Sequence, residues 1–125
     1  MNLNQPVTFL LTAQPDQATA FYRDILGLTF LRDDGFALVF TTGPILLRIG
    51  KVQAHSPALH TVLGWEVPDI TTAVAELAAK NIAFEQYPGM GQDPSGIATF
   101  PNGDKVAWFK DPDGNVLSLS QHATQ

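Results

Sequence analysis

The sequence predicts an α+β fold built from two similar modules, each with the element order βαβββ. Strand patterns, in which apolar and polar residues alternate, and helix patterns, in which apolar residues recur every three or four positions, follow one another in this order twice. The chain of 125 residues has the length of one domain, and neither module alone would bury a short sheet well. We therefore expect residues 1–125 to form a single domain, with modules at about residues 5–51 and 59–122.

In the first half, a strand pattern from Val7 to Ala13 precedes a helix that begins near Pro15. Gly27 marks the end of this helix, because glycine readily adopts the left-handed conformation that follows a last helical turn. The remaining strand patterns of this module are Leu28 to Arg32, Phe36 to Thr41 and Ile45 to Gly50.

The second half repeats the series. A strand pattern from Thr61 to Val67 precedes a helix capped by Asp69, and Asn81 stands where Gly27 stood. The later strand patterns are Ile82 to Tyr87, Ile97 to Pro101, Lys105 to Lys110 and Val116 to Gln121. Residues 28–30 (Leu-Thr-Phe) correspond to residues 82–84 (Ile-Ala-Phe), and residues 47–49 (Leu-Arg-Ile) correspond to residues 117–119 (Leu-Ser-Leu). The chain therefore contains an internal repeat.

Composition excludes several classes of function. The chain has no cysteine, so disulfides, thiolate metal sites and cysteine nucleophiles are excluded. Its formal net charge is −5 and its 7 basic residues form no cluster, so we expect neither nucleic acid nor an anionic membrane as a partner. The first residues lack the pattern of a signal peptide, and no apolar stretch is long enough to span a membrane. We expect a cytoplasmic protein.

Three motifs give the sequence a family resemblance. They are residues 20–28 (AFYRDILGL), residues 64–69 (GWEVPD) and residues 109–115 (FKDPDGN). With these motifs in this order, the chain resembles the vicinal oxygen chelate superfamily, which includes glyoxalase I, bleomycin-resistance proteins and extradiol dioxygenases. The resemblance implies that the two modules form a curved mixed sheet around a concave cleft that binds ligands, and that the protein is a homodimer.

The resemblance also implies where a metal would bind, and the residues found there do not suit one. Metal-dependent members hold a divalent ion through two histidines and two acidic residues on inward-facing strands. The matching positions in this sequence are Val7, Arg48, Val62 and Ser118. Valine cannot coordinate an ion, serine is a poor ligand, and a guanidinium repels a cation. We therefore predict no metal and no cofactor, with a divalent metal held by His60 and Glu66 as the alternative.

Five residues are predicted to bind a ligand: Arg48, His60, Glu66, Trp108 and Ser118. Strand alternation places Arg48 on the face opposite Leu47, where it needs either Glu66 or a ligand anion as its partner. Trp108 faces away from Phe109 and could stack on a flat ligand. His60 and Glu66 share one face of a strand, and Ser118 offers a hydroxyl. Val7, Phe9 and Leu11 also share a face, which is either the cleft lining, the core or a dimer interface.

The function predicted from these residues is binding of an apolar or aromatic small molecule, either neutral or anionic, without catalytic metal. One alternative is a metal-dependent lyase, isomerase or dioxygenase of the same superfamily. A metal-independent enzyme with Glu66 as its base and Arg48 stabilising negative charge is another. The domain could also be an interaction or regulatory module whose apolar face is filled by a partner protein. Whether the protein is an enzyme stays open, because one fold hosts several chemistries.

Overall fold

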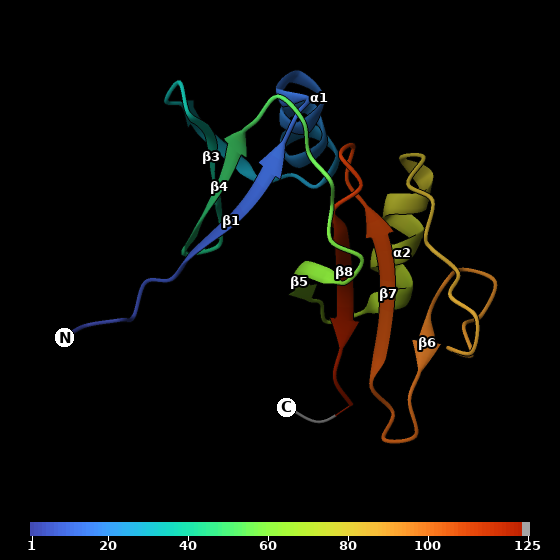
Figure 1. Cartoon of the computed structure of the whole chain (residues 1–125). Helices are drawn as coiled ribbons and strands as arrows, with labels where there is room; N and C mark the ends of the chain where they lie inside the picture. Colours follow the sequence, from blue (N-terminus) through green and yellow to red (C-terminus); the bar gives the residue numbers. More distant parts are fainter. Residues whose placement is uncertain (124–125) are drawn as a thin grey trace. The chain divides into compact units, whose positions relative to one another are not determined.

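The computed structural model describes residues 1–123, and the chain divides into two compact units, one of residues 1–57 and one that begins at Ala58. Each unit contains one four-stranded mixed sheet, and the two sheets have equivalent strand orders, β1-β4-β3-β2 and β5-β8-β7-β6 (Figure 1). The predicted α+β class and the two βαβββ modules are confirmed. Among residues 1–123, no helix is long and apolar enough to cross a membrane.

The first module forms its sheet from β1 (Val7–Thr12), β2 (Thr29–Asp33), β3 (Ala37–Thr42) and β4 (Ile45–Lys51). β1 pairs with β4 in parallel, whereas β4, β3 and β2 pair antiparallel. The parallel pair is possible because a helical crossover separates its strands in the chain. The observed strands lie within a residue or two of the predicted ones.

The helical crossover of the first module changes type part-way. α1 (Pro15–Ala20) continues directly into a π-helical segment, η1 (Phe21–Ile25), in which Leu26 N–H bonds to Phe21 C=O at 3.0 Å. This wider turn is followed by Gly27 at φ 75°, as predicted for the end of the helix. It places Phe21 and Tyr22 side by side in the core, with ring centroids 5.0 Å apart.

One face of the first sheet packs against this helical segment. Leu47 and Ile49 of β4 are fully buried, and Phe40 of β3 packs against Tyr22 at 5.9 Å and Phe30 at 5.2 Å between ring centroids. The opposite face carries Val7, Phe9 and Leu11, which are 40%, 68% and 43% exposed. The alternation expected from the sequence is therefore present.

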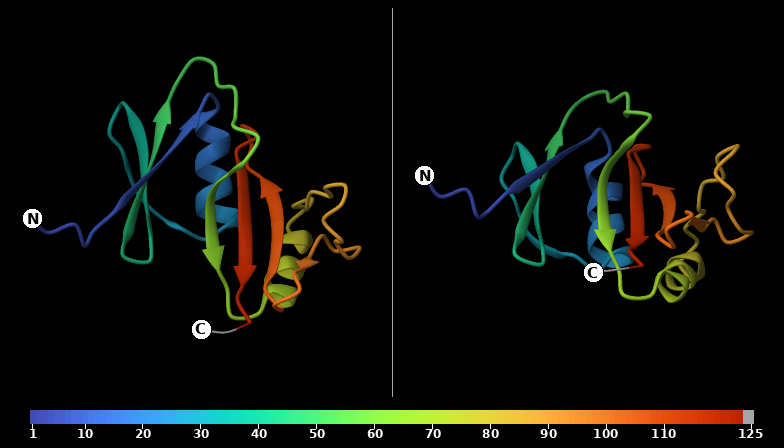
Figure 2. Two further views of the ribbon diagram at one scale, coloured as in Figure 1. Left: turned by 60° about the horizontal axis from the view of Figure 1, so that its bottom comes forward. Right: turned by 90° about the horizontal axis from the view of Figure 1, so that it is seen from below.

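The second module forms its sheet from β5 (Thr61–Glu66), β6 (Ala98–Thr99), β7 (Lys105–Lys110) and β8 (Val116–Gln121). Its helix α2 (Ile70–Ala79) packs against β7 and β8 (Figure 2). As predicted, Asp69 caps this helix by accepting hydrogen bonds from Thr72 N and Thr72 Oγ1. Asn81, at φ 68°, follows it in the left-handed conformation.

The sequence prediction of a strand from Ile82 to Tyr87 is wrong, and the predicted strand Ile97 to Pro101 shrinks to β6. The segment 82–97 lies at the edge of the sheet as an irregular chain, shown in gold in Figure 1. A backbone hydrogen bond from Glu85 N to Trp108 O, at 2.8 Å, links this segment to β7. The Gln92 side chain forms hydrogen bonds with Tyr87 N and Glu85 O, two backbone groups that a neighbouring strand would otherwise have paired.

The internal repeat extends to the packing of the core. Phe84 packs against Phe109 at 5.5 Å between ring centroids, as Phe30 packs against Phe40 in the first module. The run after β7 is a turn, as expected, because Asp111 Oδ1 accepts the backbone N–H groups of Asp113 and Asn115.

Candidate functional site

Three residues form a row across one face of the second sheet. Gly64 of β5 pairs with Ser118 of β8, which pairs with Trp108 of β7. This face is here called the open face of the second module; the buried Leu117 and Phe109 point to the other side. A Cβ atom at position 64 would collide with Ser118 Oγ, so glycine leaves the space that the Ser118 hydroxyl occupies.

A cavity of about 320 Å³ lies at one end of the open face. Its lining residues are Leu59, His60, Thr61, Tyr87, Trp108 and Val116. The Tyr87 and Trp108 rings have centroids 5.5 Å apart and planes inclined by 73°, so they form an aromatic corner. This cavity, here called the aromatic pocket, thus has walls suited to a flat apolar group.

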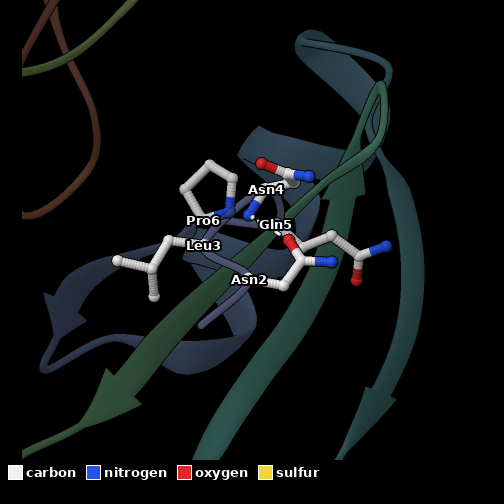
Figure 3. A pocket seen from close by; sticks show the side chains of 5 residues that line it. All are labelled: Asn2, Leu3, Asn4, Gln5 and Pro6. Atoms are coloured by element: carbon white, nitrogen blue, oxygen red, sulfur yellow. Dashed lines mark hydrogen bonds between the residues drawn. The ribbon is translucent and has the colours of Figure 1, made fainter.

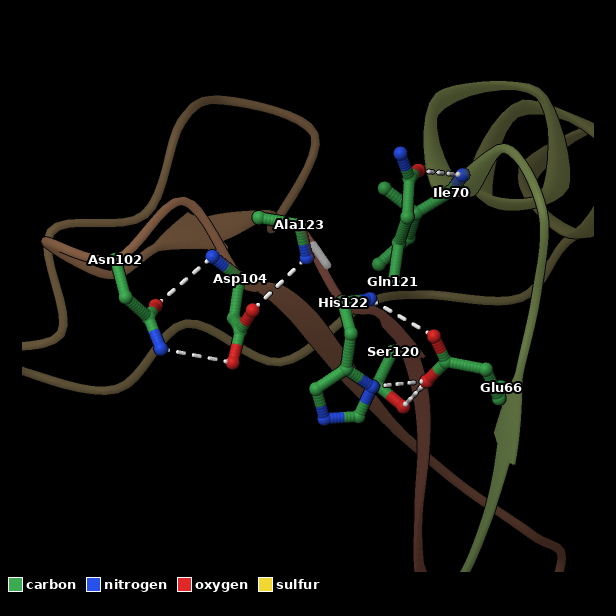
Figure 4. A network of polar contacts seen from close by, with 8 residues as sticks. All are labelled: Glu66, Ile70, Asn102, Asp104, Ser120, Gln121, His122 and Ala123. Carbon is green, nitrogen blue, oxygen red and sulfur yellow. Dashed lines mark hydrogen bonds and ion pairs between the residues drawn. The ribbon is translucent and has the colours of Figure 1, made fainter. Parts of the chain in front are cut away.

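Glu66 lies at the other end of β5, away from the aromatic pocket. Its carboxylate accepts hydrogen bonds from Ser120 Oγ at 2.9 Å and from His122 N at 2.8 Å, and His122 Nδ1 lies 2.7 Å from Oε1 (Figure 4). The backbone N–H of His122 is the largest influence on the pKa of Glu66 and lowers it, and burial opposes this effect. The Ser120 hydroxyl and the His122 ring lower the pKa further. A second cavity of about 320 Å³ is lined there by Glu66, Val67, Pro68, Gln121 and His122.

His122 is not among the five residues predicted from the sequence to bind a ligand. Strand alternation could have indicated it, because Ser118, Ser120 and His122 follow one another at every second position. Two further hydrogen bonds fix the chain around His122 (Figure 4). Gln121 Oε1 accepts one from Ile70 N at 2.8 Å, and Asp104 Oδ1 accepts one from Ala123 N at 2.9 Å. The carboxylate of Glu66 thus fastens the end of β8.

Arg48, in the first module, has a partner that the sequence analysis did not name. Its Nη2 lies 2.9 Å from Asp34 Oδ2, and the two side chains are 31% and 27% exposed. Asp34 also accepts the backbone N–H groups of Phe36 and Ala37. These two N–H groups, followed by the Arg48 guanidinium, lower the pKa of Asp34 to about 2. The expectation that Arg48 requires Glu66 or a ligand anion is corrected, because Asp34 already balances its charge.

The predicted residues of the second module do not converge on one point. His60 and Trp108 line the aromatic pocket, and Ser118 is the cross-strand neighbour of Trp108. Glu66 lies six residues after His60, so about 20 Å of extended chain separates their backbones. His60 and Glu66 therefore cannot bind one ion together within a single chain, and the metal-dependent alternative stays a prediction.

A further cavity, of about 680 Å³, is lined only by five consecutive residues, Asn2 to Pro6 (Figure 3). All five are exposed, and Asn4 N donates to Asn2 Oδ1 at 3.0 Å within the segment. No second element contributes to its lining, so it is a feature of the N-terminal segment rather than a built site.

Comparison with known families agrees with the repeat and the three motifs. The model of the Glyoxalase/Bleomycin resistance protein/Dioxygenase superfamily matches residues 4–119, nearly the whole chain. The chain belongs to this superfamily. Among curated proteins, none matches the chain.

Solved structures of other superfamily members share the fold. The chain is similar to a lactoylglutathione lyase from Agrobacterium tumefaciens, at 21% identity and a TM-score of 0.73, covering 97% of this chain and 95% of that chain. A superfamily member from Sphaerobacter thermophilus has 19% identity and a TM-score of 0.76, covering 98% and 99%. One from Nocardioides has 17% identity and a TM-score of 0.70, covering 99% and 88%. At these identities the likeness concerns the fold alone.

The superfamily's metal does not fit the residues of this chain. Val7, Arg48, Val62 and Ser118 stand at the four positions that the resemblance assigns to metal ligands, and they offer a single neutral oxygen donor. Within residues 1–123, no group of three or more histidines, aspartates or glutamates is arranged to hold an ion. Glu66, a carboxylate on the open face, is engaged with Ser120 and His122.

Proposed function

We propose that this chain binds a small, flat and largely apolar molecule in the aromatic pocket of the second module, without a catalytic metal. The observation that carries the proposal is the corner formed by the Tyr87 and Trp108 rings inside a cavity of about 320 Å³. Small-molecule sites begin at about 300 Å³ and combine apolar walls with a few polar groups. This cavity suits a ligand of one or two fused rings.

The polar groups around the corner support orientation of the ligand rather than chemistry on it. Thr61 and His60 line the pocket, and the Ser118 hydroxyl lies beside Trp108 on the next strand. These groups can hydrogen-bond a ligand, whereas the acid–base pair of the open face, Glu66 and His122, lies at its far end.

An acidic group on the ligand is a further part of the proposal. His60 and Thr61 line the aromatic pocket and offer polar groups that can hydrogen-bond to it. The predicted contact of Arg48 with a ligand anion stays a prediction for the first module, where the guanidinium contacts Asp34.

The proposal also includes a homodimer in the cytoplasm. The exposed side chains of Val7, Phe9 and Leu11 support self-association, because contiguous apolar surface is uncommon on a monomer. Sedimentation equilibrium tests this part separately. A monomer at micromolar concentration would contradict it and would leave the aromatic pocket unaffected.

Two fluorescent probes that differ in one group test the ligand class. N-phenyl-1-naphthylamine is flat and neutral, and 8-anilinonaphthalene-1-sulfonate adds a sulfonate to the same rings. We expect saturable binding of both, reduced about tenfold by Trp108→Leu, because one face of the indole contributes about 1.5 kcal/mol of apolar burial. Tighter binding of the sulfonate than of the neutral probe would support an acidic group on the ligand. Probe binding unchanged in Trp108→Leu would refute the site.

Metal analysis separates the proposal from its enzymatic alternatives. Protein purified without chelator is dialysed against nickel, zinc, manganese and ferrous iron in turn, and bound metal is measured by mass spectrometry. We expect less than one ion per chain and no effect of metal on probe affinity. One tightly bound ion per chain would overturn the metal-free part of the proposal.

A further inference from the structure

The aromatic corner joins two parts of the second module that differ greatly in support. Trp108 lies within β7, which is paired on both sides, to β8 and to β6. Tyr87 lies on the irregular segment 82–97, whose backbone bond to β7 runs from Glu85 N to Trp108 O. The position of the Tyr87 ring against Trp108 therefore depends on the hydrogen bonds that fix the segment at Tyr87.

The side-chain amide of Gln92 makes hydrogen bonds that fix this segment. Its Oε1 accepts Tyr87 N at 2.7 Å, and its Nε2 donates to Glu85 O at 2.7 Å and to Gly96 O at 2.8 Å. The amide thus ties the two residues that flank position 86 to the returning chain at Gly96. Gln92 is half-buried, so water competes poorly for these three bonds.

The chain at Gly96, to which the Gln92 amide also bonds, is itself held in place. Gly96 has φ 103°, and a Cβ there would lie 2.8 Å from Phe84 Cβ, so this glycine allows close approach of the two chains. Phe84 packs on the buried Phe109 of β7. Asp93 Oδ1 accepts Ser95 N and Ile97 N, which closes the turn between Gln92 and Gly96. Gln92 therefore bonds to a rigid support.

We infer that Gln92 is a positioning residue for the ligand site: it lines no part of the aromatic pocket and acts by holding Tyr87 against Trp108. The inference rests on the proposed function for its consequence in binding. The geometric part, that Gln92 sets the Tyr87 ring, stands on the contacts alone. Losing the amide frees Tyr87 N and Glu85 O to move toward solvent, and the ring moves with them.

The first experiment needs no ligand. Near-ultraviolet circular dichroism of wild type minus that of Tyr87→Leu defines the signal of the Tyr87–Trp108 pair. We expect Gln92→Met, which keeps the length of the side chain without its hydrogen bonds, to lose most of this signal well below its melting temperature. Gln86→Met is the matched control, because Gln86 is exposed and makes a single bond, from Nε2 to Asp93 O at 3.0 Å.

The second experiment places the effect in binding. We expect Gln92→Met to weaken N-phenyl-1-naphthylamine about fivefold in wild type and to have no further effect in the Tyr87→Leu background, because the cycle isolates action through Tyr87. Gln92→Glu provides a second variant should Gln92→Met not fold. It keeps an acceptor for Tyr87 N but faces Glu85 O and Gly96 O with a repelling oxygen, so the same losses are expected.

The outcomes distinguish the two claims. A wild-type pair signal in both Gln92 variants would overturn the inference, as would an equal loss of affinity from Gln92→Met with and without Tyr87. If wild type fails to bind the probe while Gln92→Met loses the pair signal, the proposed function fails and the positioning of Tyr87 by Gln92 stands.

Discussion

The two modules are nearly alike on one face of their sheets and differ on the other. On the buried face, Phe30 packs on Phe40 in the first module as Phe84 packs on Phe109 in the second. On the opposite face, the row Phe9, Arg48 and Val39 of the first module stands where the second has Gly64, Ser118 and Trp108. The buried face maintains the fold, so the opposite face is free to carry function and to differ.

The difference shows why only the second module forms the aromatic pocket. Val39 is fully buried beside the Arg48–Asp34 ion pair, whereas Trp108, its counterpart, is part-exposed next to Ser118, which in turn lies next to Gly64. The first module's edge strand β2 has five residues, whereas in the second module the matching residues are irregular and bring Tyr87 to Trp108. The aromatic pocket therefore forms where the neighbouring side chains are small and the edge segment is irregular.

The largest expected effect comes from breaking the shared buried face. Phe40→Ala and Phe109→Ala should each cost about 3–5 kcal/mol, because both rings are fully buried and the cavity left behind collapses only in part. Equilibrium urea unfolding followed by circular dichroism measures both variants.

The same unfolding curves test the prediction of a single domain. If residues 1–125 form one domain, each variant should show one transition, shifted by a similar amount. Two transitions, of which each variant shifts only one, would show that the modules unfold independently and would contradict the single domain.

The sequence predicted the buried face well because its determinants are local. Alternation placed Leu47, Ile49 and Phe109 inward, and Asp69 and Gly27 marked helix ends through their own backbone preferences. The segment 82–87 has the same apolar spacing, yet it forms no strand. Whether an edge segment is paired by a strand or by a side chain such as Gln92 depends on distant residues that periodicity does not report.

The site was predicted less completely for a related reason. Trp108 and Ser118 were correctly placed on one face by alternation. His60 and Glu66 were also assigned to one face, but they line different cavities, and the pairing register shifts between Thr61 and Leu63. Strict alternation does not reveal such an irregularity. The partners of charged groups, Asp34 for Arg48 and His122 for Glu66, are set by turns and chain ends rather than by spacing.

A smaller effect on stability is expected from adding a side chain at Gly64 on the open face of the second module. Gly64→Ala should cost about 1 kcal/mol, because the new Cβ pushes the Ser118 hydroxyl aside. In a Ser118→Ala background the same change should be neutral or stabilising. The first-module control is Gly50→Ala, whose Cβ would meet the flexible end of Leu11 at 3.1 Å. Thermal unfolding of the four variants decides; an equal cost in both backgrounds would show that the hydroxyl is not the obstacle.

The hydrogen bonds and the ion pair of Asp34 in the first module should make the protein less stable as the pH falls into the acid range. The folded pKa of Asp34 is about 2, below the ordinary value of 3.8, so its stabilisation is complete above pH 3.8 and is lost as the pH falls toward 2. Asp34→Asn should lower the melting temperature at neutral pH and flatten its decline between these two pH values. A variant with the full wild-type decline would show that other carboxylates cause it.

The smallest effect is expected at the matching pair of the second module, Glu66 with His122. The pKa of Glu66 is lowered from 4.5, chiefly by the His122 backbone N–H, so its stabilisation is present above pH 4.5 and is lost below it. Glu66→Gln keeps one acceptor but presents an NH₂ group where the second oxygen was. Because these side chains are 40% and 52% exposed, against 27% and 31% for Asp34 and Arg48, water screens the pair more. Glu66→Gln should therefore shift the acid limb of the melting curve less than Asp34→Asn, and a larger shift would place the stronger electrostatic fastening in the second module.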